Sequence, residues 1–258
     1  MGSEWFRRYG PAPAEATTPQ DGPRLVCFPH AGGAASAYVA LSRALAPDVD
    51  VLAVQYPGRQ DRHQEPAVDD IGRLADRLAQ EVATAVAGDG RPYAFFGHSM
   101  GAVLAYETAR RLEQRSLPGP ERLFLSGRGA PRALPNPHDQ VRTDAHVLAA
   151  IRRLGGTTGG VFQDPDLLAM VMPALRADYR AIGAYAWTPG APLSVPFTVL
   201  VGDSDPVVTV VEAEEWAGFS AGRTDVRVFS GGHFYLDHHV GAVAEVVAEA
   251  LVMAPAAG

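Results

Sequence analysis

Residues 93–102 read Tyr93-Ala94-Phe95-Phe96-Gly97-His98-Ser99-Met100-Gly101-Ala102. An apolar run typical of a buried strand leads directly into a Gly-x-Ser-x-Gly pentapeptide. Apolar side chains at helical spacing follow, at Val103, Leu104, Tyr106, Ala109 and Leu112. A strand, a tight turn and a helix in this order predict a nucleophile elbow, in which the turn lifts Ser99 clear of the sheet.

The glycines of the pentapeptide have a steric reason to be there. The turn forces Ser99 into a strained backbone conformation, and the residues two before and two after it crowd the neighbouring chain, so Gly97 and Gly101 are the types that fit. With 27 glycines in 258 residues the pattern also arises by accident, but the strand and helix that flank it favour the elbow.

The composition is that of an ordinary globular protein, with 47% hydrophobic and 20% charged residues. All 22 basic residues are arginine, which excludes Walker-A loops, Schiff-base chemistry and Ser-Lys dyads. The net charge is −7, so the composition does not suggest the basic surface that nucleic-acid binding requires. The single cysteine, Cys27, lies in an apolar run, so an internal disulfide and a cysteine zinc cluster are excluded and a cytoplasmic location is expected. No export signal or membrane span is predicted.

Strands and helices alternate along most of the chain. Residues 1–23 are a polar, Pro/Ala-rich leader, for which Trp5 and Phe6 are the expected anchors. The predicted strands cover 24–29, 49–55, the run before Ser99, 122–127, 196–201 and 225–230, and the predicted helices cover 36–46, 68–87, the run through 115, 144–154, 165–185 and 240–252. This alternation predicts an α/β fold with a mostly parallel sheet.

The alternation stops between about residues 131 and 192. We therefore expect an α/β-hydrolase core formed by 24–130 and 193–258, with 131–192 inserted as a helical lid before the strand that leads to the acid. The apolar residues of the insertion exceed what one helix face needs, which predicts that some line a pocket; they are Leu148, Ile151, Val161, Phe162, Leu168, Met172, Leu175 and Tyr179. Gly155, Gly156, Gly159 and Gly160 are candidate hinge residues.

In an α/β-hydrolase the nucleophile is followed along the chain by the acid and then the histidine. The loop Gly231-Gly232-His233 follows the last predicted strand and favours His233 over His238 and His239, which lie at the start of the final helix. For the acid, Asp203 and Asp205 compete. Asp205 is favoured because Pro206 would then pre-set the entry of the following helix, while Asp203 would serve as an Asx-turn residue.

The oxyanion hole would use two backbone N–H groups. One belongs to Met100, the residue after the nucleophile, and the other to the glycine-rich loop after the first core strand, around Ala31 or Gly32. His30 and His98 flank these donors and are expected to be structural hydrogen-bonding residues.

Five stretches together resemble the type II thioesterases that accompany polyketide and nonribosomal peptide synthases. They are Cys27-Phe28-Pro29-His30-Ala31-Gly32-Gly33, Tyr56-Pro57-Gly58-Arg59, Phe96-Gly97-His98-Ser99-Met100-Gly101-Ala102, Arg176-Ala177-Asp178-Tyr179 and Gly231-Gly232-His233-Phe234. The match spans nearly the whole chain, and one departure is Gln60, where the family often has glutamate. That change is expected to alter a loop salt bridge.

The resemblance implies hydrolysis of acyl groups from the phosphopantetheine arm of acyl or peptidyl carrier proteins, without a metal or organic cofactor. It supports Ser99, Asp205 and His233 as a catalytic triad, and Ala31 with Met100 as oxyanion donors. A monomer is expected, with no nucleic-acid or membrane partner. Carrier docking would need a local basic patch, for which the candidates are Arg59, Arg62, Arg152 and Arg153. The alternatives are a stand-alone esterase or lipase, an acyltransferase, and a non-catalytic carrier-binding protein.

Overall fold

The computed structural model of the protein describes residues 4–9, 22–86, 90–136, 139–141, 143–155 and 164–251. Val161 and Phe162 of the predicted pocket wall, and Gly156, Gly159 and Gly160 of the predicted hinge, lie outside these residues. No helix within the described ranges combines the length and the apolar content needed to cross a membrane.

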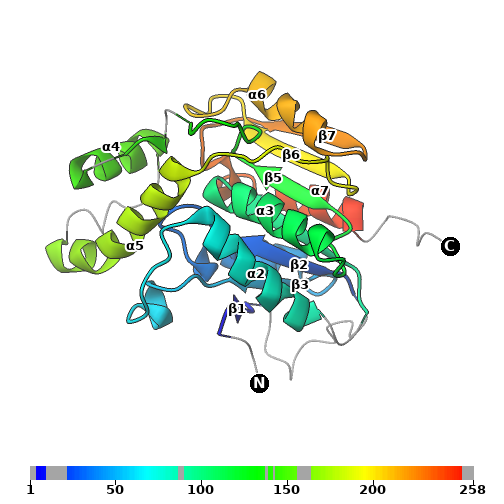
Figure 1. Cartoon of the computed structure of the whole chain (residues 1–258), viewed down its shortest axis with the longest axis horizontal. Coiled ribbons are helices and arrows are strands. Elements are labelled where there is room, and N and C mark those ends of the chain that lie inside the picture. Colours follow the sequence, from blue (N-terminus) through cyan, green and yellow to red (C-terminus); the bar gives the residue numbers. More distant parts are fainter. Residues whose placement is uncertain are drawn as a thin grey trace.

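The described residues form a seven-stranded sheet in the order β1-β3-β2-β4-β5-β6-β7 (Figure 1). Every neighbouring pair is parallel except β1 with β3. The strands are β1 (Phe6–Arg7), β2 (Arg24–Phe28), β3 (Asp50–Val54), β4 (Tyr93–His98), β5 (Leu123–Ser126), β6 (Phe197–Gly202) and β7 (Thr224–Phe229). The predicted α/β class with a mostly parallel sheet is confirmed.

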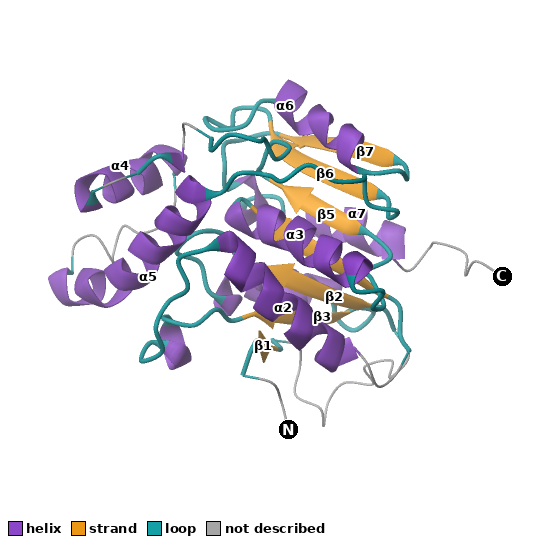
Figure 2. Cartoon of the chain, viewed as in Figure 1, coloured by secondary structure: helices purple, strands orange, loops and turns teal. Residues whose placement is uncertain are grey.

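Helices cover both faces of the sheet (Figure 2). Helices α2 (Ile71–Val86) and α3 (Met100–Gln114) pack on one face, and α1 (Val39–Leu45) and α7 (Val240–Leu251) pack on the other. Strand β4 serves both cores in alternation, because Tyr93 and Phe95 point to the α2–α3 side while Ala94 and Phe96 point to the α1–α7 side. Burial on both faces explains why the strand is an unbroken apolar run.

Two helices stand between β5 and β6 in the chain and lie beyond the carboxyl ends of the strands, at the left of Figure 1. They are α4 (Asp144–Leu154) and α5 (Pro165–Ala184), and the bounds match the predicted helices closely. Thr143 caps α4 by accepting a hydrogen bond from the His146 N–H, and Asp164 caps α5. Both helices lie on the helical runs that the sequence predicted in the segment between β5 and β6. The remaining α-helix, α6 (Val210–Glu214), follows β6.

The N-terminal residues contain a strand that the sequence analysis did not predict. Trp5 is buried, with the Arg62 guanidinium 4.4 Å from its ring centre, and the two residues after it pair antiparallel with β3 as β1. Two residues are too few to show an alternating pattern, so only the pairing partner reveals this strand.

Candidate active site

Ser99 occupies the strained position that an elbow requires. Its φ of 57° and ψ of −117° place it outside the regions that side-chain-bearing residues normally adopt, directly before α3. Its N–H donates to the Ser126 carbonyl at 2.8 Å. A Cβ added to Gly97 would overlap the Gly101 carbonyl, and one added to Gly101 would overlap the Phe28 carbonyl. The steric reason predicted for both glycines is therefore confirmed.

The structure brings Ser99, His233 and Asp205 into one hydrogen-bonded chain. His233 Nε2 lies 3.0 Å from Ser99 Oγ, and His233 Nδ1 lies 2.7 Å from Asp205 Oδ2. The side chains of His233 and Asp205 are 1% and 0% exposed. Asp205 follows β6 and His233 follows β7, so both approach Ser99 at the carboxyl ends of parallel strands. Asp205 Oδ1 also accepts the Val207 N–H at 2.9 Å, which fixes the carboxylate toward the ring.

The two competing aspartates do different things. Asp203 is exposed, and its Oδ1 accepts the Gly231 N–H at 3.0 Å and the Ser204 hydroxyl at 2.9 Å. The Gly231 N–H lowers the pKa of the Asp203 carboxyl. Asp203 thus holds the loop that carries His233, while Asp205 contacts the ring itself.

The reason given for preferring Asp205 was wrong in one respect. The helix after it does not begin at Pro206 but at Val210, where Thr209 and Glu212 form a capping box. The two histidines weighed against His233 also lie elsewhere: His238 is exposed, and His239 Nε2 lies 2.9 Å from the Ser230 carbonyl oxygen.

Two further histidines lie near the site. His98 Nδ1 is 2.9 Å from Ser126 Oγ, which is 2.6 Å from the Tyr235 hydroxyl. Burial lowers the pKa of His98 well below its usual range, and burial, with the nearby His233, lowers the pKa of His30 to about 4. Both rings are therefore neutral at pH 7. His233 is the histidine that reaches Ser99 Oγ.

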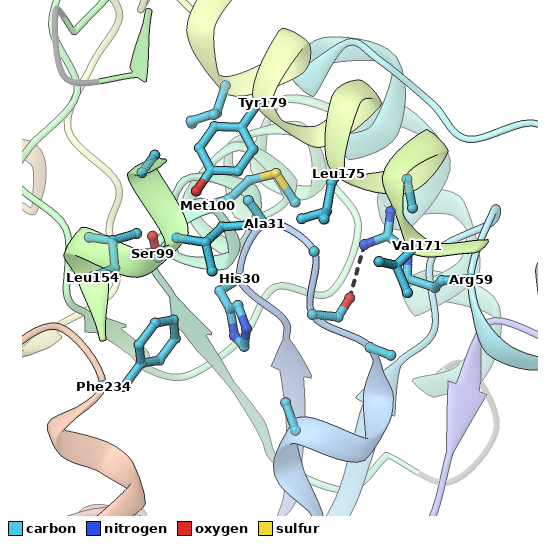
Figure 3. A pocket seen from close by; sticks show the side chains of 18 of the residues that line it. His30, Ala31, Arg59, Ser99, Met100, Leu154, Val171, Leu175, Tyr179 and Phe234 are labelled. Carbon is cyan, nitrogen blue, oxygen red and sulfur yellow. Dashed lines mark hydrogen bonds between the residues drawn. The ribbon is translucent and has the colours of Figure 1, made fainter. Parts of the chain in front are cut away.

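The two candidate oxyanion donors flank the serine. Ala31 lies in the loop after β2, and Met100 is the first residue of α3. Among the described residues, no protein acceptor takes the N–H of either. Ala31, Ser99 and Met100 line the same cavity, and Figure 3 shows them close together. Both N–H groups are therefore available to a ligand at this point.

The cavity has a volume of about 540 Å³. Its apolar wall comes from α4 and α5 and consists of Ala150, Ile151, Leu154, Met170, Val171, Ala174, Leu175, Tyr179 and Ile182. Of the apolar insertion residues predicted to line a pocket, Ile151, Leu175 and Tyr179 do so, while Leu148, Leu168 and Met172 pack between the two helices. Within the described part of the chain, no three His, Cys, Asp or Glu side chains gather as a metal site would need.

Arg59, a candidate docking residue that lines this cavity, pairs with Asp178, to which the sequence analysis gave no role. Arg59 and Asp178, 119 residues apart, form a two-pronged ion pair with N–O distances of 2.7 and 2.8 Å. They are 7% and 1% exposed. The spacing of the two motifs carries no signal that they meet, because only the packing of α5 against the loop after β3 brings them together.

The departure at Gln60 is accommodated by hydrogen bonds. Gln60 Nε2 donates to Ser36 Oγ at 2.7 Å, and Gln60 Oε1 accepts from Gln55 Nε2 at 3.3 Å. The Gln60 side chain contacts none of Ser99, His233 and Asp205 through a hydrogen bond.

Two of the four candidate docking arginines were wrong. Arg59 and Arg62 are 7% and 6% exposed, and each pairs with a carboxylate, Asp178 or Glu65. A residue in this state does not present its charge to a partner. Arg152 and Arg153 are exposed near the end of α4, and Arg153 also lines the cavity.

Comparison with known proteins gives a consistent set of relatives. The family model of the thioesterase domain matches residues 23–251. The probable cadicidin biosynthesis thioesterase of Streptomyces griseus is 47% identical over 96% of this chain and 66% of its own length. Thioesterase PikA5 of Streptomyces venezuelae is 46% identical over 90% of this chain and 80% of its own length. The structure of BorB, the type II thioesterase from the borrelidin biosynthetic cluster, matches with a TM-score of 0.83 at 44% identity, covering 96% of this chain and 97% of that one.

Proposed function

This chain belongs to the type II thioesterases, and we propose that it hydrolyses acyl thioesters held on the phosphopantetheine arm of acyl or peptidyl carrier proteins. The observation that carries the proposal is the hydrogen-bonded chain from Asp205 through His233 to Ser99 beside a cavity with an apolar wall. The proposal is supported by relatives named for cadicidin biosynthesis, for the borrelidin biosynthetic cluster and for the yersiniabactin NRPS/PKS biosynthetic pathway.

The first half of the reaction forms an acyl-enzyme. Ser99 Oγ attacks the thioester carbonyl carbon while His233 Nε2 takes the hydroxyl proton, and the Ala31 and Met100 N–H groups stabilise the negative oxygen that results. The carbon–sulfur bond then breaks, and His233 returns the proton to the leaving pantetheine sulfur. Asp205 keeps the ring oriented and stabilises its protonated form.

The second half releases the acid. His233 takes a proton from water, the hydroxide attacks the Ser99 ester, and the same two N–H groups stabilise the second tetrahedral oxyanion. The carbon–oxygen bond to Ser99 breaks, and the serine recovers its proton from His233. Both halves use the same side chains and backbone N–H groups, and the second half consumes one water molecule.

The lining of the cavity favours the acyl group as the part of the substrate that binds inside it. Its α4–α5 wall is apolar, as an alkyl or aryl chain requires, and it begins beside Ser99. Hydrophobic walls discriminate by roughly 1–3 kcal/mol per methylene, so we expect the enzyme to accept a range of chain lengths.

The test is release of acyl groups from carrier protein. A panel of acyl chains from acetyl to decanoyl is loaded on phosphopantetheinylated carrier protein, and loss of the acyl mass is followed by intact-protein mass spectrometry with the Ser99→Ala variant as control. We expect release by the unmodified enzyme and none above background by the variant. An esterase would hydrolyse free esters but leave the carrier loaded, and an acyltransferase would move the acyl group to an added amine or alcohol faster than to water.

A further inference from the structure

The loop that carries Ala31 is held in place by a residue of the inserted helices. The Gly32 N–H, one peptide after the candidate oxyanion donor, donates to Asp178 Oδ2 of α5 at 2.7 Å. The same carboxylate receives both Nη atoms of Arg59. Arg59 Nη1 in turn donates to the Gly33 carbonyl at 2.9 Å. Asp178 and Arg59 therefore hold the loop at two consecutive residues, Gly32 and Gly33.

The clamp acts on the orientation of the Ala31 N–H through the geometry of the turn. The Gly33 N–H donates to the His30 carbonyl at 2.9 Å, which closes the loop into a tight turn. Because a peptide unit is planar and trans, the His30 carbonyl and the Ala31 N–H point in opposite directions. Fixing the carbonyl inside the turn therefore points the Ala31 N–H out of it.

On the side of the turn that faces α5, the described contacts are one packing contact and the hydrogen bond to Asp178. Gly32 has a φ of +76°, and a Cβ there would overlap the Leu175 side chain of α5, so the loop and the helix are in direct contact. Leu175 supplies packing at this contact and no hydrogen bond. The Asp178 carboxylate is the polar group that meets the Gly32 N–H.

We propose that Asp178 and Arg59 are positioning residues that hold the Ala31 N–H in the direction needed to stabilise the oxyanion. The proposal rests on the assignment of Ala31 as an oxyanion donor in the proposed function. Burial alone would lower the pKa of Arg59, but the facing Asp178 carboxylate raises that pKa above its usual value, so the guanidinium stays charged. The helix α5 thus contributes to catalysis as well as to the cavity wall.

The test compares Asp178→Ala and Asp178→Asn with the unmodified enzyme on a small activated ester. We expect kcat to fall by about 10-fold to 100-fold in Asp178→Ala with KM little changed, less than the roughly 100-fold to 1,000-fold cost of deleting an oxyanion donor. Asp178→Asn keeps an oxygen for the Gly32 N–H and should retain more activity. If Asp178→Ala does not fold, Asp178→Asn and Arg59→Gln carry the comparison.

Two inhibitors separate positioning from a general structural effect. An acyl trifluoromethyl ketone adds to Ser99 Oγ and places an oxyanion in the hole, whereas an acyl thioether fills the cavity without forming one. Affinity for the ketone should fall by the same factor as kcat/KM, and affinity for the thioether should stay within about twofold. Equal losses for both inhibitors, or an unchanged kcat and ketone affinity, would overturn the proposal.

Glu107→Gln is the matched control. Glu107 is also a buried carboxylate paired with arginine, at 2.9 Å from Arg110 and 2.6 Å from Arg111, and it accepts the Tyr185 hydroxyl at the end of α5. It stands on α3 about 12 Å along the helix axis from Ser99. We expect it to lower the melting temperature without changing kcat or ketone affinity. Since the ester assay needs no carrier protein, failure of carrier hydrolysis in the unmodified enzyme would contradict the proposed function and leave this comparison intact.

Discussion

At the scale of single residues, the site depends on a strained serine and on neutral histidines around it. The positive φ of Ser99 is tolerated because hydrogen bonds fix the backbone on both sides of it. The Ser99 N–H donates to the Ser126 carbonyl, and the Ala102 N–H donates to the Ser99 carbonyl. Strain of this kind persists only where the surroundings fix it, and it is typical of functional sites.

The proposed triad predicts a steep and non-additive loss of activity. Ser99→Ala and His233→Ala should each lower kcat by about four orders of magnitude or more, and the double variant should be little worse, because the residues act as a unit. Asp205→Asn should be severe and Asp203→Asn mild, since only Asp205 contacts the ring. Steady-state kinetics with circular dichroism as a folding check measures this. A severe Asp203→Asn effect beside a mild Asp205→Asn effect would move the acid to Asp203.

The lowered pKa of His30 predicts acid sensitivity. The folded-state pKa of about 4 lies below the value of 6.5 that applies to an unfolded histidine, so between these values the unfolded chain binds the extra proton. The free energy of unfolding therefore falls as pH falls from 6.5 toward 4, and this contribution levels off below 4. Between pH 7 and pH 5 we expect His30 to lower the free energy of unfolding by about 1–2 kcal/mol. The loss should lie at the low end of this range because His30 is partly exposed.

Urea unfolding at the two pH values measures this loss. In His30→Gln the difference between pH 7 and pH 5 should shrink by about that amount, whereas the exposed-site variant His238→Gln should behave as the unmodified protein. An unchanged difference in His30→Gln would show that other groups cause the acid sensitivity.

At the scale of elements, the inserted helices divide into an anchored part and an outer part. Asp178 and Leu175 connect the C-terminal part of α5 to the loop at Ala31. Leaving one charge of a buried ion pair without its partner costs about 3–5 kcal/mol. Pro173 lies inside α5, where it removes one helical hydrogen bond. If the insertion acts as a lid, we expect α4 and the part of α5 before Pro173 to move and the rest to stay.

A larger side chain on the α4 wall of the cavity should change which acyl-chain lengths the enzyme prefers. Ala150 lines the cavity, so Ala150→Leu should lower kcat/KM for octanoyl-carrier by about tenfold or more while acetyl-carrier is little affected. Ala149 is exposed on the same helix and does not line the cavity, which makes Ala149→Leu the control. Competition between the two acylated carriers, followed by mass spectrometry, gives the ratio directly. Equal losses for both chains would show that this wall does not contact the acyl group.

At the scale of the whole molecule, the net charge of −7 works against encounter with an acidic carrier protein. A local cationic patch near the cavity mouth would offset the repulsion. With Arg59 and Arg62 buried, the exposed pair at the end of α4 is what remains of the predicted patch, and Arg153 lines the cavity itself.

Charge reversal of Arg153 tests docking. Arg153→Glu should lower kcat/KM for acyl-carrier severalfold to tenfold at low salt, with a smaller effect at high salt because screening weakens the interaction. Turnover of a small activated ester should be unchanged. Arg227→Glu makes the same charge change at an exposed position of the edge strand β7. It should leave the turnover of both substrates unchanged. A salt-independent effect, or equal effects of the two variants, would exclude a docking role for Arg153.

Much of the architecture followed from local pattern. The apolar run before Gly97 and the helical spacing after Met100 determined the strand, the turn and the helix, because these periodicities arise from burial on one face or two. The runs 144–154 and 165–185 predicted α4 and α5, and the structure shows why these helices start where they do: Thr143 and Asp164 cap them, within one turn of helix. The choice of Asp205 and His233 as partners of Ser99 came from the order nucleophile, acid, histidine along an α/β-hydrolase chain.

Only the tertiary structure decided which polar groups meet across long separations. The sequence offered Arg59 as a surface docking residue and left Asp178 without a role, and folding placed the two in one buried ion pair that holds the Ala31 loop. The two-residue strand β1 is stable only because β3 offers it a partner. Periodicity and capping report the surroundings of a residue within a few positions along the chain. An ion pair over 119 residues depends on how whole elements pack, and no local pattern records that.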